Sequence, residues 1–198
     1  MIVSALEAVL ARPDVWRGAA AHWAETLPSG LAALDAALGG GWPLGVLGDC
    51  LVQCEAGGMA LFLPALARLT REHWAVLISP PHVPYAPALA QAGVDLSRLL
   101  VLRPPSDERL WAALQCLESG ACSAVFLWGG DGGLRDFRRL QLAAEESRVL
   151  AVLFHVRDEH RPAALRLAVR PRPEGGLVVE LLKCRGRPAR RIELPDAV

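Results

Sequence analysis

One stretch of the sequence indicates the fold most clearly: Leu51-Val52-Gln53-Cys54-Glu55-Ala56-Gly57-Gly58-Met59-Ala60. Its apolar start continues a run that begins at Val46, its centre holds two adjacent glycines, and a helical pattern follows. A buried strand, a glycine-containing loop and a helix, in that order, form the phosphate-binding loop of many α/β proteins. The stretch therefore predicts an α/β fold and marks the place where a nucleotide would bind.

The side chains that hold phosphate in such a loop are missing here. A phosphate-binding loop needs a glycine at each end, a lysine for the β and γ phosphates, and a serine or threonine hydroxyl for magnesium. The degenerate loop instead contains Gln53, Gly57, Gly58, Met59 and Ala60. The only lysine of the chain is Lys183, more than a hundred residues away. We therefore predict no bound nucleotide or other cofactor.

Catalytic and metal-binding residues are not indicated elsewhere either. The strand that would carry a magnesium carboxylate ends in Trp128, and Asp131 follows in a glycine-rich turn where a solvated carboxylate is expected. His82 and His155 have no nucleophile and orienting carboxylate beside them in the pattern. The five cysteines include no two pairs at zinc-ligand spacing, so we expect them to pack as small apolar side chains.

Short apolar runs alternate with helical patterns, which is typical of a mainly parallel sheet with crossover helices. The predicted strands are Val46–Gln53, Trp74–Ser79, Leu99–Leu102, Ser123–Trp128 and Leu150–Phe154. The predicted helices are Ala60–Arg71, Tyr85–Ala92, Glu108–Ser119 and Leu134–Ser147. After His155 the pattern becomes alternating, and it predicts antiparallel strands at Leu165–Arg170, Leu177–Leu182 and Arg191–Leu194.

Length and composition fit one α/β domain with an appended arm. The chain has 198 residues, of which 53% are hydrophobic, and a formal net charge of zero. We predict an arm at residues 1–27, with a short helix at Val3–Leu10, and a domain at residues 28–198. No apolar run is long enough to cross a bilayer, and the first residues do not form a signal peptide. These features predict a cytoplasmic protein with no membrane partner.

Three further segments carry a family resemblance. Residues 27–45, LPSGLAALDAALGGGWPLG, resemble the entry segment of RecA recombinases, and the match continues through Gly93-Val94-Asp95-Leu96 and Ser119-Gly120-Ala121. Within that superfamily, the chain is most similar to the ImuA proteins of bacterial mutagenic translesion synthesis. The segments that carry this closer likeness are Asp14-Val15-Trp16-Arg17-Gly18, PPHVPYAPAL at 80–89 and RRLQLAA at 138–144.

The resemblance implies a RecA-like core that has lost its ATP chemistry. The glutamate that polarises the attacking water in RecA falls on Pro81, and the residues that hold adenine fall near Tyr85 and Ala88. Proline can neither accept a proton nor orient water. The two DNA-binding loops of RecA are reduced to Gly129–Gly133 and roughly Arg157–Pro162. We therefore expect a non-catalytic protein that does not form RecA-like filaments on DNA by itself.

The same resemblance implies function through protein partners. An ImuA-like protein would contact RecA and the polymerase-like subunit ImuB, and so assist an error-prone polymerase at damaged DNA during the SOS response. SulA-type cell-division inhibitors, which bind FtsZ, share this degenerate design and remain an alternative. A DNA-binding module that uses the C-terminal arginines is a third reading.

Two surfaces are candidates for partner binding. In RecA the arm docks on the neighbouring subunit, and here Val15, Trp16 and Arg17 would be its anchors. The second candidate is a basic cluster around a Gly/Pro turn, composed of Lys183, Arg185, Arg187, Arg190 and Arg191. Such a cluster binds phosphate or an acidic partner segment, but a solvated hairpin tip has the same composition. The sequence does not decide between these two interpretations.

Overall fold

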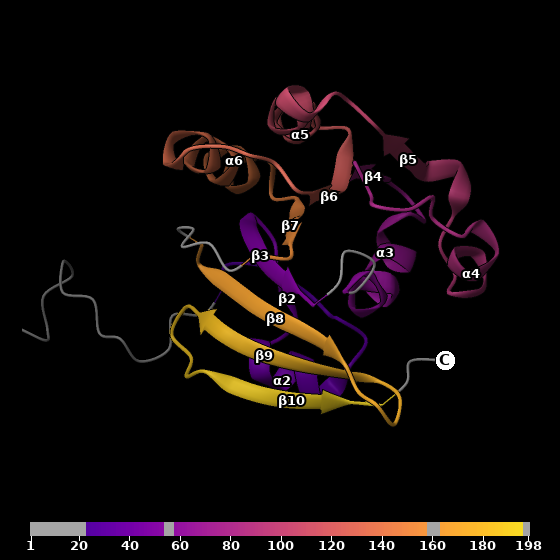
Figure 1. Ribbon diagram of the computed structural model, residues 1–198, viewed down its shortest axis with the longest axis vertical. Helices are drawn as coiled ribbons and strands as arrows, with labels where there is room; N and C mark the ends of the chain where they lie inside the picture. The colour runs from indigo at the N-terminus through magenta and orange to yellow at the C-terminus, as the bar shows by residue number, and fades with distance from the viewer. Residues whose placement is uncertain (1–22, 54–57, 158–162, 196–198) are drawn as a thin grey trace, which may run out of the picture.

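The computed structural model describes residues 23–53, 58–157 and 163–195, and its centre is an eight-stranded mixed sheet (Figure 1). The strands follow the order β10-β9-β8-β3-β7-β6-β4-β5. Five of them form a parallel block: β3 (Val46–Val52), β4 (Trp74–Ile78), β5 (Leu99–Leu102), β6 (Cys122–Trp128) and β7 (Leu150–His155). This arrangement confirms the predicted α/β class.

Helices cover both faces of the parallel block, so the molecule has a three-layer core. The elements are α2 (Ala32–Leu38), α3 (Leu63–Leu69), α4 (Ala86–Gln91), α5 (Arg109–Glu118) and α6 (Leu134–Ser147). One apolar cluster packs α2, α3 and α4 against the sheet, and a second packs α5 and α6 against the opposite face. The four inner strands β3, β4, β6 and β7 are largely buried on both sides, which explains their nearly continuous apolar sequences.

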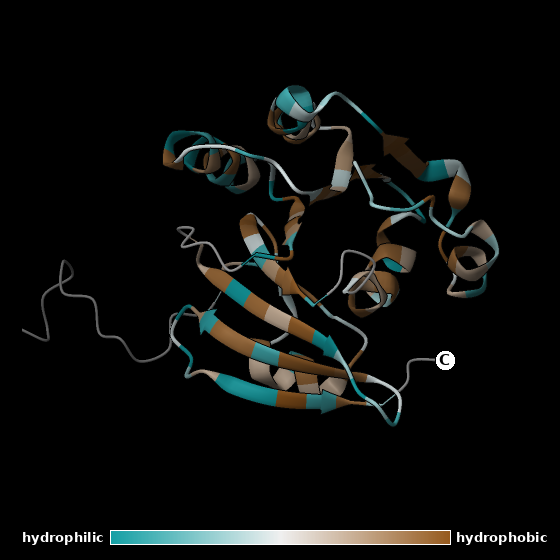
Figure 2. Ribbon diagram, in the orientation of Figure 1, coloured by the Kyte–Doolittle hydropathy of each residue, from teal (hydrophilic) through white to brown (hydrophobic). Residues whose placement is uncertain are grey.

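The C-terminal strands extend the sheet on the far side of β3. They are β8 (Leu165–Pro171), β9 (Leu177–Cys184) and β10 (Arg190–Leu194). β8 pairs in parallel with β3, whereas β8, β9 and β10 pair antiparallel with one another. Hydrophilic and hydrophobic residues alternate along these strands in Figure 2, as expected for a sheet with one buried face. The predicted antiparallel ending is therefore confirmed.

The helix predicted at Ala60–Arg71 is wrong in its start and its end. A 3₁₀ turn, η1 (Met59–Phe62), comes first, and α3 begins only at Leu63. Pro64 lies in the first turn of α3. Proline has no backbone N–H and a fixed φ, so it fits the start of an α-helix and not its interior. Thr70 then ends the helix with its own N–H bonded to the Leu66 carbonyl.

The residues that lead into the domain form a small substructure that the periodicity did not predict. Strands β1 (Thr26–Leu27) and β2 (Trp42–Pro43) pair antiparallel on either side of α2. Trp23 Nε1 donates a hydrogen bond to the Leu38 carbonyl at 3.1 Å. The described end of the predicted arm, residues 23–27, is therefore packed on the domain. The rest of the arm, with Val15, Trp16 and Arg17, lies outside the described residues.

Candidate functional site

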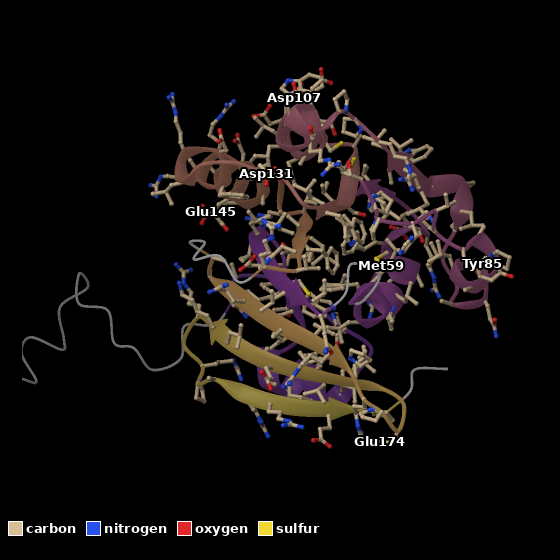
Figure 3. The ribbon with its side chains drawn as sticks, viewed as in Figure 1. Met59, Tyr85, Asp107, Asp131, Glu145 and Glu174 are labelled. Atoms are coloured by element: carbon tan, nitrogen blue, oxygen red, sulfur yellow. The ribbon has the colours of Figure 1, made fainter. Side chains whose placement is uncertain are left out.

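The described part of the degenerate loop offers neither a cation nor a hydroxyl group. Gln53 and Ala60 are exposed, and Met59 packs against the apolar cluster below α3 (Figure 3). Gly58 is buried with φ 86°, and a Cβ on it would lie 2.7 Å from Val52 Cγ1 and 3.2 Å from a Phe154 ring carbon. This glycine thus serves close packing of the turn on the sheet. Residues 54–57, including Gly57, lie outside the described chain.

A cluster of aromatic rings fills the space beneath this turn. Phe62 stacks on Trp42 at 4.3 Å between ring centroids and meets the edges of Phe126 and Phe154 at 5.5 Å each. Phe154 in turn stacks on Trp128 at 4.6 Å. All five rings are buried. They therefore form a dry, closely packed wall where β3, β6 and β7 end.

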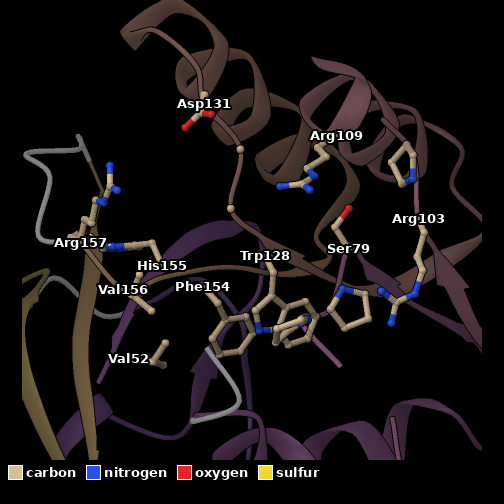
Figure 4. A pocket seen from close by; sticks show the side chains of 15 residues that line it. Val52, Ser79, Arg103, Arg109, Trp128, Asp131, Phe154, His155, Val156 and Arg157 are labelled. Carbon is tan, nitrogen blue, oxygen red and sulfur yellow. Dashed lines mark hydrogen bonds between the residues drawn. The ribbon is translucent and has the colours of Figure 1, made fainter. Parts of the chain in front are cut away.

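Beyond that wall, a cavity of about 550 Å³ opens at the carboxyl ends of β4, β6 and β7 (Figure 4). This edge of a parallel sheet is where open α/β folds place their ligands. Trp128 and Phe154 line the cavity, as do Ser79 and Pro81 from the end of β4. Its ionisable lining residues, among those that the structure describes, are Arg103, Arg109, Arg157, His155 and Asp131. In Figure 4 Arg157 and Arg103 lie on opposite sides, with Arg109 between them.

A buried ionic network supports one wall of the cavity. Asp49 on β3, only 3% exposed, accepts a hydrogen bond from Arg166 Nε at 2.7 Å through Oδ2, and Oδ1 contacts Nε2 of His155. His155 Nδ1 lies 2.6 Å from the carbonyl oxygen of Arg157. Both ring nitrogens thus lie against oxygen atoms, one from the Asp49 carboxylate and one from the Arg157 carbonyl. The network ties β3, β7 and β8 together and fixes the backbone at Arg157.

The pKa of Asp49 reflects two opposing influences. Burial removes the carboxylate from water and raises its pKa. Hydrogen bonds and charge attraction from His155 and Arg166 act in the opposite direction and outweigh burial, so the pKa lies below the ordinary value of 3.8. Asp49 is therefore an ionised carboxylate at neutral pH, held in place by Arg166 and His155.

The other residues singled out from the sequence are dispersed. Pro81 lines the cavity, but Tyr85 is 71% exposed at the outer edge near α4 (Figure 3), and His82 and Ala88 are exposed as well. Asp131 is a solvent-exposed carboxylate at the rim. No group of three metal-ligating side chains occurs in residues 23–53, 58–157 and 163–195. Cys50, Cys116, Cys122 and Cys184 are free thiols.

The basic cluster at the β9–β10 turn divides into partnered and exposed side chains. Arg187 Nη1 donates to the Ala36 carbonyl at 3.1 Å, where a guanidinium also complements the helix dipole of α2. Arg191 donates to Glu193 Oε1 at 3.1 Å. Lys183, Arg185 and Arg190 are exposed. The structure therefore gives Arg187 a packing role on α2.

Comparison with known proteins connects part of this chain to RecA. No protein-family profile matches it. It is 35% identical over 85 residues to RecA of Prochlorococcus marinus strains MIT 9303 and MIT 9313, which is 42% of this chain and 22% of each RecA. It is also 35% identical over 104 residues to the chloroplastic DNA repair protein recA homolog 1 of Arabidopsis thaliana, 51% of this chain and 24% of that protein. The chain thus spans about a quarter of these relatives' length, and the similarity supports a RecA-related protein.

No helix in the described part of the chain combines the length and apolar character needed to cross a bilayer.

Proposed function

We propose that this chain is a cytoplasmic, RecA-related accessory protein that does not hydrolyse ATP and acts by binding RecA and ImuB in error-prone translesion synthesis. The partial similarity to RecA and the ImuA-like segments support this role. Met59 and Pro81 occupy the positions of the lysine and glutamate on which ATP hydrolysis by RecA depends. A RecA-type core that lacks ATP chemistry can still act through its surfaces, by binding other proteins.

The observation that carries the proposal is the open, apolar edge of the sheet at β5. This strand pairs with β4 on one side and with no other strand among the described residues. Leu100 and Val101 are 42% and 38% exposed, and Trp74 at the start of β4 is 46% exposed. An unpaired strand edge with apolar side chains is a template for a strand of another chain. In RecA, the arm that docks on the neighbouring subunit includes such a strand, and the resemblance implies a comparable mode of contact for this chain.

A pull-down against RecA, ImuB and FtsZ from the same organism tests this surface. We expect the double change Leu100→Lys and Val101→Lys to weaken binding of RecA or ImuB at least about 30-fold, the loss typical of an interface hot spot. Leu182→Lys on β9 is the matched control, because Leu182 is 41% exposed and remote from β5. Circular dichroism checks that each variant folds. Equal binding by the edge variant, or no binding of RecA and ImuB by the native chain, would contradict the proposal.

The two candidate partner-binding surfaces near the chain termini are tested in the same pull-down assay, each with its own variant. Deletion of residues 1–22 removes Val15, Trp16 and Arg17 but keeps Trp23 and β1 on the domain. Deletion of residues 183–198 would remove β10, whose Ile192 and Leu194 are buried, and would disturb the fold. The basic cluster is therefore tested by charge reversal at its exposed side chains, Lys183, Arg185 and Arg190. Capture of FtsZ alone would support the SulA-type alternative. Salt-sensitive capture of DNA through these residues would support the DNA-binding module.

The absence of ATP hydrolysis is a separate expectation. Purified chain should release no phosphate from ATP above a protein-free blank, and the double change Met59→Lys and Ala60→Thr should not create turnover. Restoring the lysine and hydroxyl still leaves Pro81 where a water-orienting carboxylate is needed. Phosphate release that is lost in a folded variant at Gly57 or Gly58 would overturn this expectation.

A further inference from the structure

Unpaired hydrogen-bond donors gather at the cavity on the carboxyl edge of the sheet. Among the described residues, four buried side-chain nitrogen or oxygen atoms have no hydrogen-bond partner: Trp42 Nε1, Ser79 Oγ, Arg109 Nε and Trp128 Nε1. Three of these four, all but Trp42 Nε1, belong to side chains that line this one cavity. Arginine and indole nitrogens can only donate, and a serine hydroxyl donates readily. Buried donors without acceptors are rare and indicate an acceptor that binds between them.

The charges around the cavity specify what kind of acceptor fits. Arg103 follows β5, Arg109 begins α5 and Arg157 follows β7, so three separate segments each contribute an arginine to the lining of one cavity. None of the three forms an ion pair within the described residues. Among the described residues of the lining, Asp131 is the single carboxylate, and His155 contacts the carboxylate of Asp49. The excess of positive charge favours an anion with more than one negative charge.

Local backbone geometry holds Arg109 and Ser79 at the cavity. Gly129 has φ 71°, and a Cβ there would lie 3.0 Å from Arg109 Nη1, so the glycine leaves room for the guanidinium. Ser79 has φ 51°, a left-handed conformation that residues with a side chain seldom adopt, and its N–H is bonded to the Leu102 carbonyl at 2.8 Å. Strained residues of this kind are concentrated at functional sites. Trp128 is only 7% exposed, and its stacking on Phe154 fixes the indole.

We propose that this cavity binds a phosphate-type dianion, held by Arg109 and Trp128 with support from Ser79, Arg103 and Arg157. Of the degenerate loop, the described residues Gln53, Gly58, Met59 and Ala60 do not line the cavity. Arginine is suited to the task, since its planar guanidinium forms paired hydrogen bonds to phosphate oxygens. The volume of about 550 Å³ also accommodates a small organic phosphate. The occupant is inorganic phosphate or the phosphate group of a small molecule.

Isothermal titration calorimetry of the full chain at low ionic strength tests the site, with inorganic phosphate, AMP and acetate as separate probes. We expect phosphate or AMP to bind and the monoanion acetate to bind at least tenfold more weakly. Affinity for AMP well above that for phosphate identifies an organic phosphate as the occupant, and equal affinity identifies the free ion. No binding of either dianion, or equal binding of acetate, would overturn the proposal.

Two substitutions connect the binding to the named groups. Arg109→Met keeps an unbranched side chain and removes the guanidinium, and Trp128→Phe keeps a ring against Phe154 and removes the Nε1 donor. We expect at least tenfold weaker phosphate binding for the first and at least threefold for the second. Arg138→Met, at an exposed position on α6 that does not line the cavity, should bind like the native chain. Unchanged affinity in Arg109→Met would contradict the proposal, whatever the outcome of the pull-down assay.

Discussion

Replacing Asp49 by alanine is expected to lower the free energy of unfolding by about 3–5 kcal/mol, the range found when one partner of a buried ion pair is removed. The substitution leaves the buried His155 and the mostly buried Arg166 without the carboxylate that contacts both side chains and pairs with the Arg166 guanidinium. It also removes a side chain that connects β3 to both of its neighbours, β7 and β8, through His155 and Arg166. Urea unfolding followed by circular dichroism measures the change.

The control for this variant is Asp107→Ala. Asp107 is exposed at the start of α5, and its loss should alter the free energy of unfolding by no more than about 0.5 kcal/mol. A change below about 1 kcal/mol for Asp49→Ala would show that the network contributes little to stability. The pH dependence gives a second check, because the folded-state pKa of Asp49 is lowered. Its contribution is fully present above pH 3.8 and is lost as pH falls through the folded-state pKa, so the two proteins should converge in strong acid.

The second large effect is expected at Phe62, where alanine should cost about 3–5 kcal/mol of unfolding free energy. Phe62 is 1% exposed and touches three other rings, so truncation leaves a cavity between η1, β6 and β7. Phe62→Leu fills most of that volume and should cost only roughly 1.5 kcal/mol. Both variants are measured by urea unfolding at neutral pH.

Leu142→Ala provides the comparison, since Leu142 is 52% exposed on α6 and its loss should change the unfolding free energy by about 0.5 kcal/mol or less. If Phe62→Ala were no more destabilising than Leu142→Ala, the packed aromatic wall beneath the degenerate loop would be contradicted. The comparison matters for function because these rings occupy the space behind the turn where a phosphate-binding loop keeps a polar, charged interior.

Sequence periodicity was sufficient to predict the long and strongly patterned elements. The bounds of β5 and α6 agree with the prediction: β5 follows a 3₁₀ turn at Leu96–Arg98 and ends before Pro104, while α6 starts after Gly133 and ends at Arg148, which has φ 54°. The ribbon of β1 and β2 was missed because two-residue strands have no periodicity to detect. The start of α3 was misplaced because apolar residues at 59–63 fit a helix equally well, and only Pro64 indicates where the α-helical turn begins.

For the candidate sites too, features that lie within one short segment could be predicted from the sequence, whereas contacts between distant segments could not. The missing lysine and hydroxyl of the loop are evident from the residues themselves. The network of Asp49 and Arg166 joins positions 117 residues apart, and it exists because β3 lies between β7 and β8. A charged residue inside the apolar run 46–52 was the one available signal for it. The cavity donors come from separate segments, namely the ends of β4 and β6 and the start of α5, so the sequence order does not reveal that they line one cavity.

The central place of β3 affects how the chain folds as it leaves the ribosome. β3 is the first strand of the large sheet to be synthesised, yet both of its neighbours, β7 at Leu150–His155 and β8 at Leu165–Pro171, come from the last third of the chain. About a hundred residues must therefore be synthesised after β3 before a strand is available to pair with either of its edges, which takes several seconds at ordinary rates of translation. Pairing between such distant segments is slow. During that interval the apolar strand and its flanking rings form the segment most in need of chaperone protection.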